Sequence, residues 1–359
     1  MMSQKDNIED ILMECNIPFI ANYNLKSNSY SKTGNVASKF IMPKNTSELE
    51  CLIKRFNELD IPYKVVGDTT NILFLDSVIY SNIISTKLVT EVVFSNNKVE
   101  VACGKNLPDF VRELSMRDYT GFEGLEGIPG TIGGGIFMNA GAYGYEISDH
   151  LESVKFINPN GVVLTLNKDD LSFDRRTSYF KKNEGCIILS ATFNLKVGSS
   201  ETIYNKIEKY HIARHKYQEW VYPNLGSIYS SNLSIYESSS CKRFYMKFKI
   251  VRKLFYTNPI AKYYNRLYPS NKRLNVLFLS HFNMLKYSDF PSKKNINTFV
   301  NRNFSTLEIV DYISVLGQVI NNETYLENEL VLGPIQEITE PLSYGKTIDT
   351  YNHLINNSI

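Results

Sequence analysis

The sequence predicts an α+β protein with mixed sheets rather than a regular alternation of strands and helices. Three observations support this class. An apolar helical stripe at residues 47–56 precedes extended runs at 63–66 and 72–75, which flank a polar loop. Residues 91–103 alternate about a Ser-Asn-Asn-Lys turn, as a β-hairpin does. Residues 151–196 then return to strand-like patterns.

Two of the expected helices begin at capping boxes. Ser47 and Glu50 have the spacing of this motif, and so do Ser305 and Glu308. The second helix carries a buried stripe of Ile309, Ile313, Leu316 and Ile320. A short helix is expected after Pro108 and a polar helix over residues 201–222.

The length of 359 residues predicts two or three domains. We expect boundaries that give units of residues 1–85, 86–200 and 201–335. The segment after Pro334 has no strong pattern, so residues 336–359 are expected to form a tail lying on the surface.

Composition excludes several classes of protein. A net charge of +2 creates no global demand for nucleic acid or an anionic membrane, and no apolar run approaches the length of a membrane span. The polar, acidic start (MMSQKDNIED) is unlike a secretion signal. Five scattered cysteines without CxxC spacing indicate free, buried thiols and a reduced cytoplasmic setting. The five histidines show no ligand spacing, so no metal site is expected.

The most informative stretch is residues 121–146, GFEGLEGIPGTIGGGIFMNAGAYGYE. It holds nine of the 19 glycines in the chain. Glycine allows main-chain N–H groups to approach a ligand and to form an anion-binding concavity, so a pyrophosphate is the expected guest. The spacing matches neither GxxxxGK[ST] nor the strand-to-helix GxGxxG, which indicates a nucleotide cradle of another type. A purely structural β-corner is the alternative.

The segment GIPGTIGGGIFMNAGAYGYE resembles the central signature of the UDP-N-acetylenolpyruvoylglucosamine reductase (MurB) family, flavoenzymes of peptidoglycan synthesis. Shorter segments resemble other motifs of that family in the right order. These are SYSKTGNVA at 29–37, YKVVGDTTNILFLD at 63–76, LSFDRRTSYFK at 171–181, YPNLGSI at 222–228 and a closing region ending in LENELVLG.

The resemblance implies a two-subdomain FAD-binding fold of the PCMH/VAO-like type, followed by a MurB-type α+β substrate domain. FAD would lie between the first two units, and NADPH would be the reductant. The expected cofactor contacts are Gly67, Asp68, Thr69, Thr70, Asn71, Gly130, Thr131, Ile132, Gly133, Gly134, Asn139 and Ala142. The expected partner is a small UDP-sugar, bound by a monomer or weak oligomer without nucleic acid or stable membrane insertion.

Three residues match the family's catalytic positions. Arg176 would hold the substrate carboxylate and stabilise charge that develops beside it. Ser227 would donate the proton, and Glu329, the second acid of LENE, would assist the polarisation. Asn301 is a further candidate for a polar contact to cofactor or substrate. In an arbitrary chain each of these residues would be read as a surface charge or a turn.

The chain also departs from the family pattern. Asp68, Thr69 and Thr70 replace the usual residues before Asn71, and a left-handed Thr69 would be strained by roughly 1–2 kcal/mol. Arg175 stands where the family has tyrosine, and no basic residue follows Ser227 directly. Residues 236–292 are rich in tyrosine and lysine and resemble the family very little. They form either a solvated face over buried aromatics or a patch for a polyanion or membrane surface.

The resemblance therefore predicts an enzyme that reduces the enolpyruvyl ether of UDP-N-acetylglucosamine to UDP-N-acetylmuramate. Two alternatives remain open at this point. The rewritten substrate region favours a relative that acts on another nucleotide sugar in surface polysaccharide synthesis. The altered loop at residues 67–70 favours a non-catalytic flavin- or nucleotide-binding relative.

Overall fold

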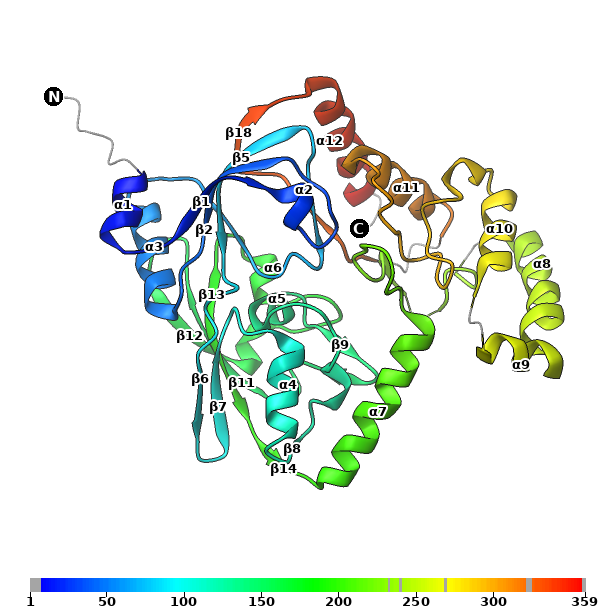
Figure 1. Cartoon of the computed structure of the whole chain (residues 1–359), viewed down its shortest axis with the longest axis horizontal. Helices are drawn as coiled ribbons and strands as arrows, with labels where there is room; N and C mark the ends of the chain where they lie inside the picture. The colour runs from blue at the N-terminus through cyan, green and yellow to red at the C-terminus, as the bar shows by residue number, and fades with distance from the viewer. Residues whose placement is uncertain (1–7, 232, 239–240, 268–269, 321–324, 357–359) are drawn as a thin grey trace.

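The computed structural model describes residues 8–231, 233–238, 241–267, 270–320 and 325–356. Two five-stranded sheets occupy one side of the molecule, and a group of helices extends from the other (Figure 1). The α+β class is confirmed. Residues 1–7, on which the expectation about the start of the chain partly rests, lie outside the described part. No helix of the described residues is long and apolar enough to cross a membrane.

The first sheet joins the N-terminal region to the end of the chain. Strand β5 (Val78–Ser85) is its centre and pairs in parallel with β2 (Val36–Ile41) and with β3 (Lys64–Val66). Strand β1 (Phe19–Asn24) lies antiparallel to β2. The other neighbour of β5 is β18 (Ile335–Ile338), which also runs antiparallel.

Within the described residues, the segment after Pro334 therefore forms a strand and a helix rather than the expected patternless tail. After β18 the chain forms α12 (Pro341–Asn356), which packs on α11 (Thr306–Gln318) and buries Thr347 and Leu354. A four-residue strand is too short for a periodicity signal, because its register depends on the partner strand rather than on its own pattern.

The second sheet is entirely antiparallel, in the order β12-β11-β13-β7-β6. Its strands are β6 (Val92–Ser95), β7 (Lys98–Ala102), β11 (Leu151–Ile157), β12 (Val163–Asn167) and β13 (Ile187–Asn194). The hairpin expected at 91–103 is confirmed as β6 and β7. One hydrophobic core packs helices α1 (Ile8–Glu14), α3 (Thr46–Glu58) and α4 (Leu107–Ser115) against this sheet.

Helix α3 begins two residues earlier than its expected capping box. Its N-cap is Asn45, whose Oδ1 accepts from the Glu48 N–H at 2.8 Å, while the Glu48 carboxylate accepts from the Lys44 N–H. Ser47 already lies inside the helix. The capping box of Ser305 and Glu308 at the start of α11 is confirmed.

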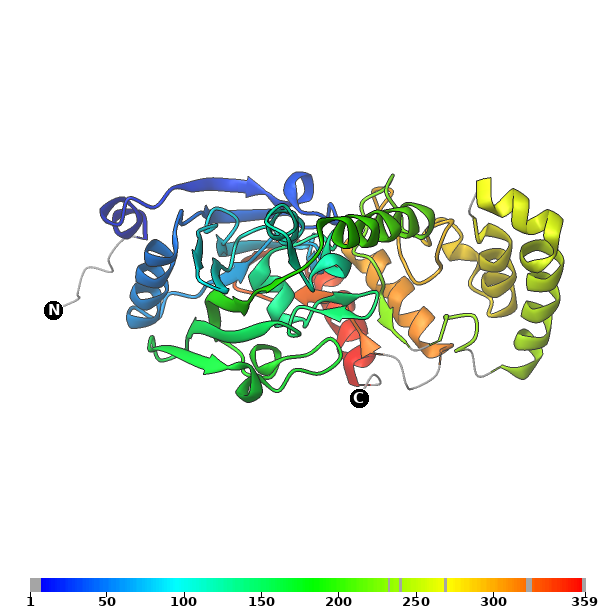
Figure 2. The same ribbon diagram turned by 90° about the horizontal axis from the view of Figure 1, so that it is seen from below.

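A second core unites the first sheet with the C-terminal helices. Buried Phe40 and Tyr80 of the sheet share it with Phe244, Phe278 and Tyr312. The polar helix α7 (Ser200–Tyr217) leads from the second sheet towards the C-terminal part of the chain. One end of the molecule there is formed by helices (Figure 2). These are α8 (Lys242–Arg252), a π-helical turn (Lys253–Thr257), α9 (Pro259–Leu267) and α10 (Lys272–His281).

The cysteines show why composition alone assigns burial poorly. None of the five is joined in a disulfide, but only Cys103 is buried, and Cys51 is exposed. Burial raises the pKa of the Cys103 thiol to about 12, so this side chain stays protonated near neutral pH.

Candidate active site

The two loops expected to hold the cofactor lie against each other. One is the segment from Gly67 to Asn71, between β3 and β4 (Ile72–Phe74), and the other precedes the short helix α5 (Ile132–Phe137). A Cβ on Gly67 would meet Thr131 Oγ1 at 2.5 Å, so only glycine permits this approach. Thr70 Oγ1 donates to the Pro129 carbonyl at 3.0 Å.

Unused main-chain donors gather where these loops meet. Within the described chain, the N–H groups of Asp68, Thr69 and Thr70 donate to no protein acceptor, nor do those of Gly130 and Thr131. Four of these residues are half-buried and Thr131 is buried, so an acceptor from outside the chain is needed to satisfy the donors. Such a set fits the diphosphate of a dinucleotide.

Three neighbouring N–H groups are already used inside the protein. Ile132 donates to the Lys105 carbonyl at 2.9 Å and Gly133 to the Cys103 carbonyl at 2.7 Å. The N–H of Gly134 donates to Thr131 Oγ1, which caps α5. Main-chain donation to a diphosphate from this second loop is thus left to Gly130 and Thr131.

The unusual residues of the first loop have local partners. Thr69 has a φ of 58°, the left-handed conformation considered above, and its Oγ1 accepts from the Tyr30 N–H at 2.9 Å. Asp68 forms an ion pair with Lys87 at 2.5 Å, which offsets the negative charge that the sequence places beside the phosphate position. The hydrogen bond from Tyr30 therefore partly offsets the backbone strain at Thr69, and Lys87 partly offsets the charge of Asp68.

Asn139 is a structural cross-link. It is buried with a φ of 43°, and its Nδ2 donates to Glu146 at 2.9 Å and to the Asp174 carbonyl at 3.1 Å. Its Oδ1 is buried without a partner in the described chain. Asn139 thereby ties the hairpin that carries Ala142 to the loop that carries Arg176.

A cavity of about 760 Å³ is lined by the hairpin that carries Ala142 and by the loop that carries Arg176, but not by Gly67–Asn71 or by the segment before α5. Its walls come from the hairpin β9 (Gly141–Ala142) and β10 (Tyr145–Glu146), from the loop at Arg175 and Arg176, and from the segment after Ser227. Arg176, Ser227 and Glu327 are among its charged and hydroxyl-bearing lining residues, together with Glu146 and Asp174. Ala142 also lines it, whereas Glu329 does not.

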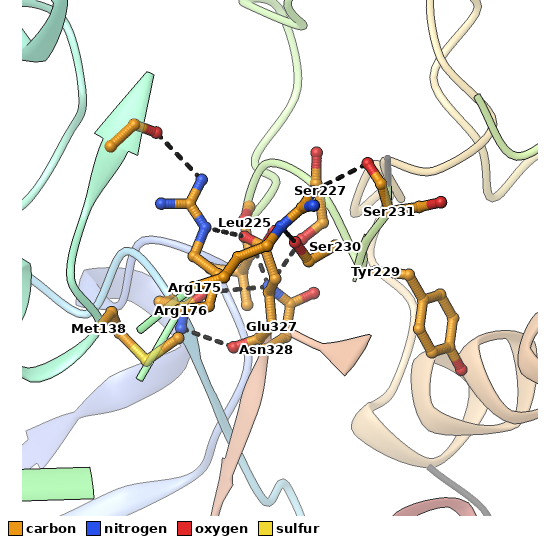
Figure 3. A network of polar contacts seen from close by, with 12 residues as sticks. Met138, Arg175, Arg176, Leu225, Ser227, Tyr229, Ser230, Ser231, Glu327 and Asn328 are labelled. Atoms are coloured by element: carbon orange, nitrogen blue, oxygen red, sulfur yellow. Dashed lines mark hydrogen bonds and ion pairs between the residues drawn. The ribbon is translucent and has the colours of Figure 1, made fainter. Parts of the chain in front are cut away.

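Arg176 lies at the centre of this group and has a φ of 55° (Figure 3). Its Nε is 3.3 Å from Glu327 Oε2, and its NH2 donates to the Gly141 carbonyl at 3.1 Å. The guanidinium is thus oriented by a carboxylate on one side and a carbonyl on the other. Glu327, the first acid of LENE, was not among the residues expected at the site.

Glu329 is connected to Arg176 indirectly, through the side chain of Lys181. Lys181 Nζ lies 3.5 Å from Glu329 Oε1 and 3.5 Å from the Arg176 carbonyl. The Glu329 N–H donates to the Asn71 carbonyl at 3.0 Å, because β17 (Glu329–Val331) pairs in parallel with β4. This pairing joins the first cofactor loop to the acidic strand.

Asn71 connects the cradle to the cavity more directly. Its Nδ2 donates to the Glu327 carbonyl at 2.8 Å, and its Oδ1 accepts from Asn328 at 3.1 Å. The side chain of Asn301, in contrast, makes its hydrogen bonds within the protein. Its Nδ2 donates to the carbonyls of Ser31 and Lys32, and its Oδ1 accepts from the Phe304 N–H, so it is not placed to meet a ligand.

Arg175 is the second cation of the cavity. Its Nε donates to Ser230 Oγ at 2.8 Å and its NH2 to the Ser231 carbonyl at 2.9 Å (Figure 3). The strands β15 (Tyr229–Ser230) and β16 (Tyr325–Leu326) pair with Ser230 opposite Tyr325, and the Glu327 N–H donates to the Ile228 carbonyl at 2.8 Å. The described residues contain no group of three or more side chains arranged to hold a metal ion.

The fold and the two touching loops define a dinucleotide-binding α+β protein, and residues 37–167 match the FAD binding domain family. Over 228 residues the chain is 35% identical to the UDP-N-acetylenolpyruvoylglucosamine reductase of Streptococcus pneumoniae (strain JJA), covering 64% of this chain and 75% of that protein. The same enzyme from Streptococcus pneumoniae serotype 4 (strain TIGR4) is 34% identical, and the match covers 64% of this chain and 71% of that protein. The chain belongs to the UDP-N-acetylenolpyruvoylglucosamine reductase family.

The fold comparison agrees. The crystal structure of UDP-N-acetylenolpyruvylglucosamine reductase (MurB) from Thermus caldophilus superposes with a TM-score of 0.60 at 21% identity, covering 89% of this chain and 99% of that one. The family expected from the motifs is confirmed.

Proposed function

We propose that this protein is an FAD-dependent oxidoreductase that reduces the enolpyruvyl ether of UDP-N-acetylglucosamine with NADPH and yields UDP-N-acetylmuramate, a precursor of peptidoglycan. The observation that carries the proposal is that Arg176, Ser227 and Glu327 line one cavity, and that Asn71, which follows the unused amides of the first loop, donates to the Glu327 carbonyl. Family membership supports the same reaction.

The residues suited to FAD are those whose N–H groups are free, namely Asp68, Thr69, Thr70, Gly130 and Thr131. Bound there, FAD supplies the hydride for the double bond, with electrons that come from NADPH. The protein's own contribution is to bind, to orient and to move a proton.

Arg176 is suited to the substrate carboxylate. Hydride addition to one carbon of the double bond leaves enolate-like charge next to that carboxylate, and a guanidinium stabilises both negative groups. Glu327 and the Gly141 carbonyl hold the guanidinium in place. We assign Glu329 to the same polarisation, because Lys181 links its carboxylate to the Arg176 main chain.

Ser227 is suited to deliver the proton to the other carbon. Its side chain lines the cavity beside Arg176, and an enolate is basic enough to take the proton of an oriented hydroxyl. Arg175 gives the cavity a second cation and takes the place of the basic residue missing after Ser227. We assign it to the diphosphate of the UDP-sugar.

The test begins with the purified protein. We expect it to be yellow and to release FAD on denaturation, and we expect UDP-N-acetylenolpyruvoylglucosamine to stimulate NADPH oxidation and gain two hydrogen atoms. A colourless protein that does not take up FAD would contradict the flavin assignment. A yellow protein whose NADPH oxidation is unaffected by this substrate would instead favour the alternative of another nucleotide sugar.

A further inference from the structure

The charge of the chain is distributed very unevenly. Residues 238–288 contain no Asp or Glu and eleven Lys or Arg, although the whole chain carries only +2. The rest of the protein is therefore net negative. This segment includes helices α8, α9 and α10, which lie together at one end of the long axis in both views (Figures 1 and 2). A single-signed end creates a local field that the total charge conceals.

Most of these cations are not neutralised by the protein. Within the described chain, the carboxylates that pair with the segment's cations are Glu237, which lies 2.7 Å from Arg252, and Asp311, which lies 3.6 Å from Lys286. The remaining exposed cations have no carboxylate within 4.0 Å in the described part. They include Lys242, Arg243, Lys247, Lys253, Lys262 and Lys272.

Helix α8 separates its buried and exposed faces clearly. At roughly 100° per residue, Phe244 and Phe248 point in the direction opposite to Met246. Phe244 and Phe248 are buried in the core, whereas Met246 is 61% exposed. The cations Lys242, Arg243 and Lys249 all fall within about 60° of Met246 on this helix. The outward face of α8 thus mixes positive charge with apolar surface.

Exposed apolar side chains also follow α8 along the chain. Ile250 is 60% exposed and Leu254 is 58% exposed, and the next helix adds Ile260 at 84% and Tyr263 at 72%. Lys253 and Lys262 lie among them and are exposed. We name this surface the basic-apolar face and define it as Lys242, Arg243, Met246, Lys247, Lys249, Ile250, Lys253, Leu254, Ile260, Lys262 and Tyr263.

We propose that the basic-apolar face docks the protein on the surface of an anionic phospholipid bilayer. Its cations match the phosphate-bearing headgroups, and its exposed aliphatic side chains can enter the boundary between headgroups and acyl chains. Nucleic acid explains the face less well, because a phosphate backbone gains nothing from Ile260, Leu254 and Ile250, and the face as defined offers a single aromatic ring, Tyr263, for base stacking. The docking is peripheral and uses a site separate from the cavity.

Vesicle binding of the full chain tests the proposal. We expect the protein to co-sediment with vesicles of phosphatidylcholine and phosphatidylglycerol but not with phosphatidylcholine alone, and to dissociate as salt is added. The double variant Lys253→Glu/Lys262→Glu should bind at least about tenfold more weakly, since each basic residue near an anionic surface contributes substantially. The variant Leu254→Ser/Ile260→Ser should also weaken binding to vesicles, and it should retain the salt dependence.

A matched control lies on α12, where Leu342 is 83% exposed and Lys346 is also exposed. Leu342→Ser/Lys346→Glu removes the same kinds of groups elsewhere and should bind vesicles like the wild type. Equal binding by this control and by the Lys253/Lys262 variant would overturn the proposal. So would failure to bind anionic vesicles at moderate salt, or tighter binding to a duplex oligonucleotide that is insensitive to the Leu254/Ile260 substitutions. All variants should keep the cavity chemistry, so the reductase assay reports independently on the proposed function.

Discussion

Arg176 is paired with Glu327 rather than with Glu329: its Nε lies 3.3 Å from Glu327 Oε2, and both side chains face the cavity. A substrate carboxylate that binds Arg176 must share the guanidinium with Glu327 or displace it. Glu329 reaches the same region only through Lys181. The two acids of LENE therefore have different neighbours and should be separable by mutation.

We expect Glu329→Gln to lower kcat by roughly 100-fold or more, as removal of a group that helps to stabilise charge in the transition state does. Glu327→Gln should change KM more than kcat, because it alters how Arg176 is held before substrate arrives. Steady-state kinetics on both variants gives the comparison. The reverse pattern would transfer the catalytic assignment from Glu329 to Glu327.

Ser227→Ala should separate the two half-reactions. Reduction of bound flavin by NADPH should stay near the wild-type rate, while turnover of the enol ether should fall by about 100-fold or more. Stopped-flow measurement of each half-reaction tests this. Ser231→Ala is a matched control, because Ser231 lines the same cavity and its Oγ contacts Ser238 at 3.1 Å. Equal loss of both half-reactions in Ser227→Ala would refute the assigned role.

Arg175→Ala should raise KM for the UDP-sugar by roughly 10- to 100-fold, the range expected for hydrogen bonds to a charged group. Arg175→Lys keeps the charge but loses the planar fork that now reaches both Ser230 and Ser231, so it should be intermediate. The KM for NADPH measures any general damage to the site. An unchanged KM for the UDP-sugar in Arg175→Ala would remove Arg175 from substrate recognition.

Thr69 is expected to show two opposing contributions to stability. Thr69→Ala loses the hydrogen bond from the Tyr30 N–H and keeps a left-handed side chain, so the free energy of unfolding should fall by about 1 kcal/mol. Thr69→Gly loses the same bond but relieves a strain of roughly 1–2 kcal/mol. Urea unfolding should therefore rank the glycine variant above the alanine variant. The opposite order would mean that the loop is not strained at this position.

His150 should make the fold sensitive to acid. Burial lowers the pKa of His150 below its ordinary value, an effect that Lys168 and Lys196 reinforce and that Asp149 and Glu123 oppose. Because the unfolded chain then binds a proton at higher pH than the folded chain, stability is full above the unfolded pKa of about 6.5 and falls as the pH drops below it.

His150→Phe preserves the ring that packs on Phe122, with centroids 5.0 Å apart, and removes the titrating group. Urea midpoints measured between neutral and mildly acidic pH should show a shallower decline in this variant. A decline as steep as in the wild type would assign the acid sensitivity to other groups, such as His281, whose pKa is also lowered by burial and by Lys247 and Arg243.

Features of this protein that depend on local chemistry can be predicted from the order of its residues. The glycine-rich loop, the hairpin at β6 and β7 and the capping box at Ser305 follow from short-range preferences, and each forms where it was expected. The family motifs likewise lie within contiguous segments. The segment 238–288, which contains no Asp or Glu, can also be identified from the sequence alone.

Only the tertiary structure decided which distant groups meet. The parallel pairing of β17 with β4 brings Glu327 and Glu329 to Asn71, and no local pattern encodes a partner more than 250 residues away. The same reason explains why β18 could not be recognised, since its register comes from β5. The choice of Glu327 as the partner of Arg176 depends on where two separate loops end, because side-chain pairing follows the assembled backbone rather than the order of residues.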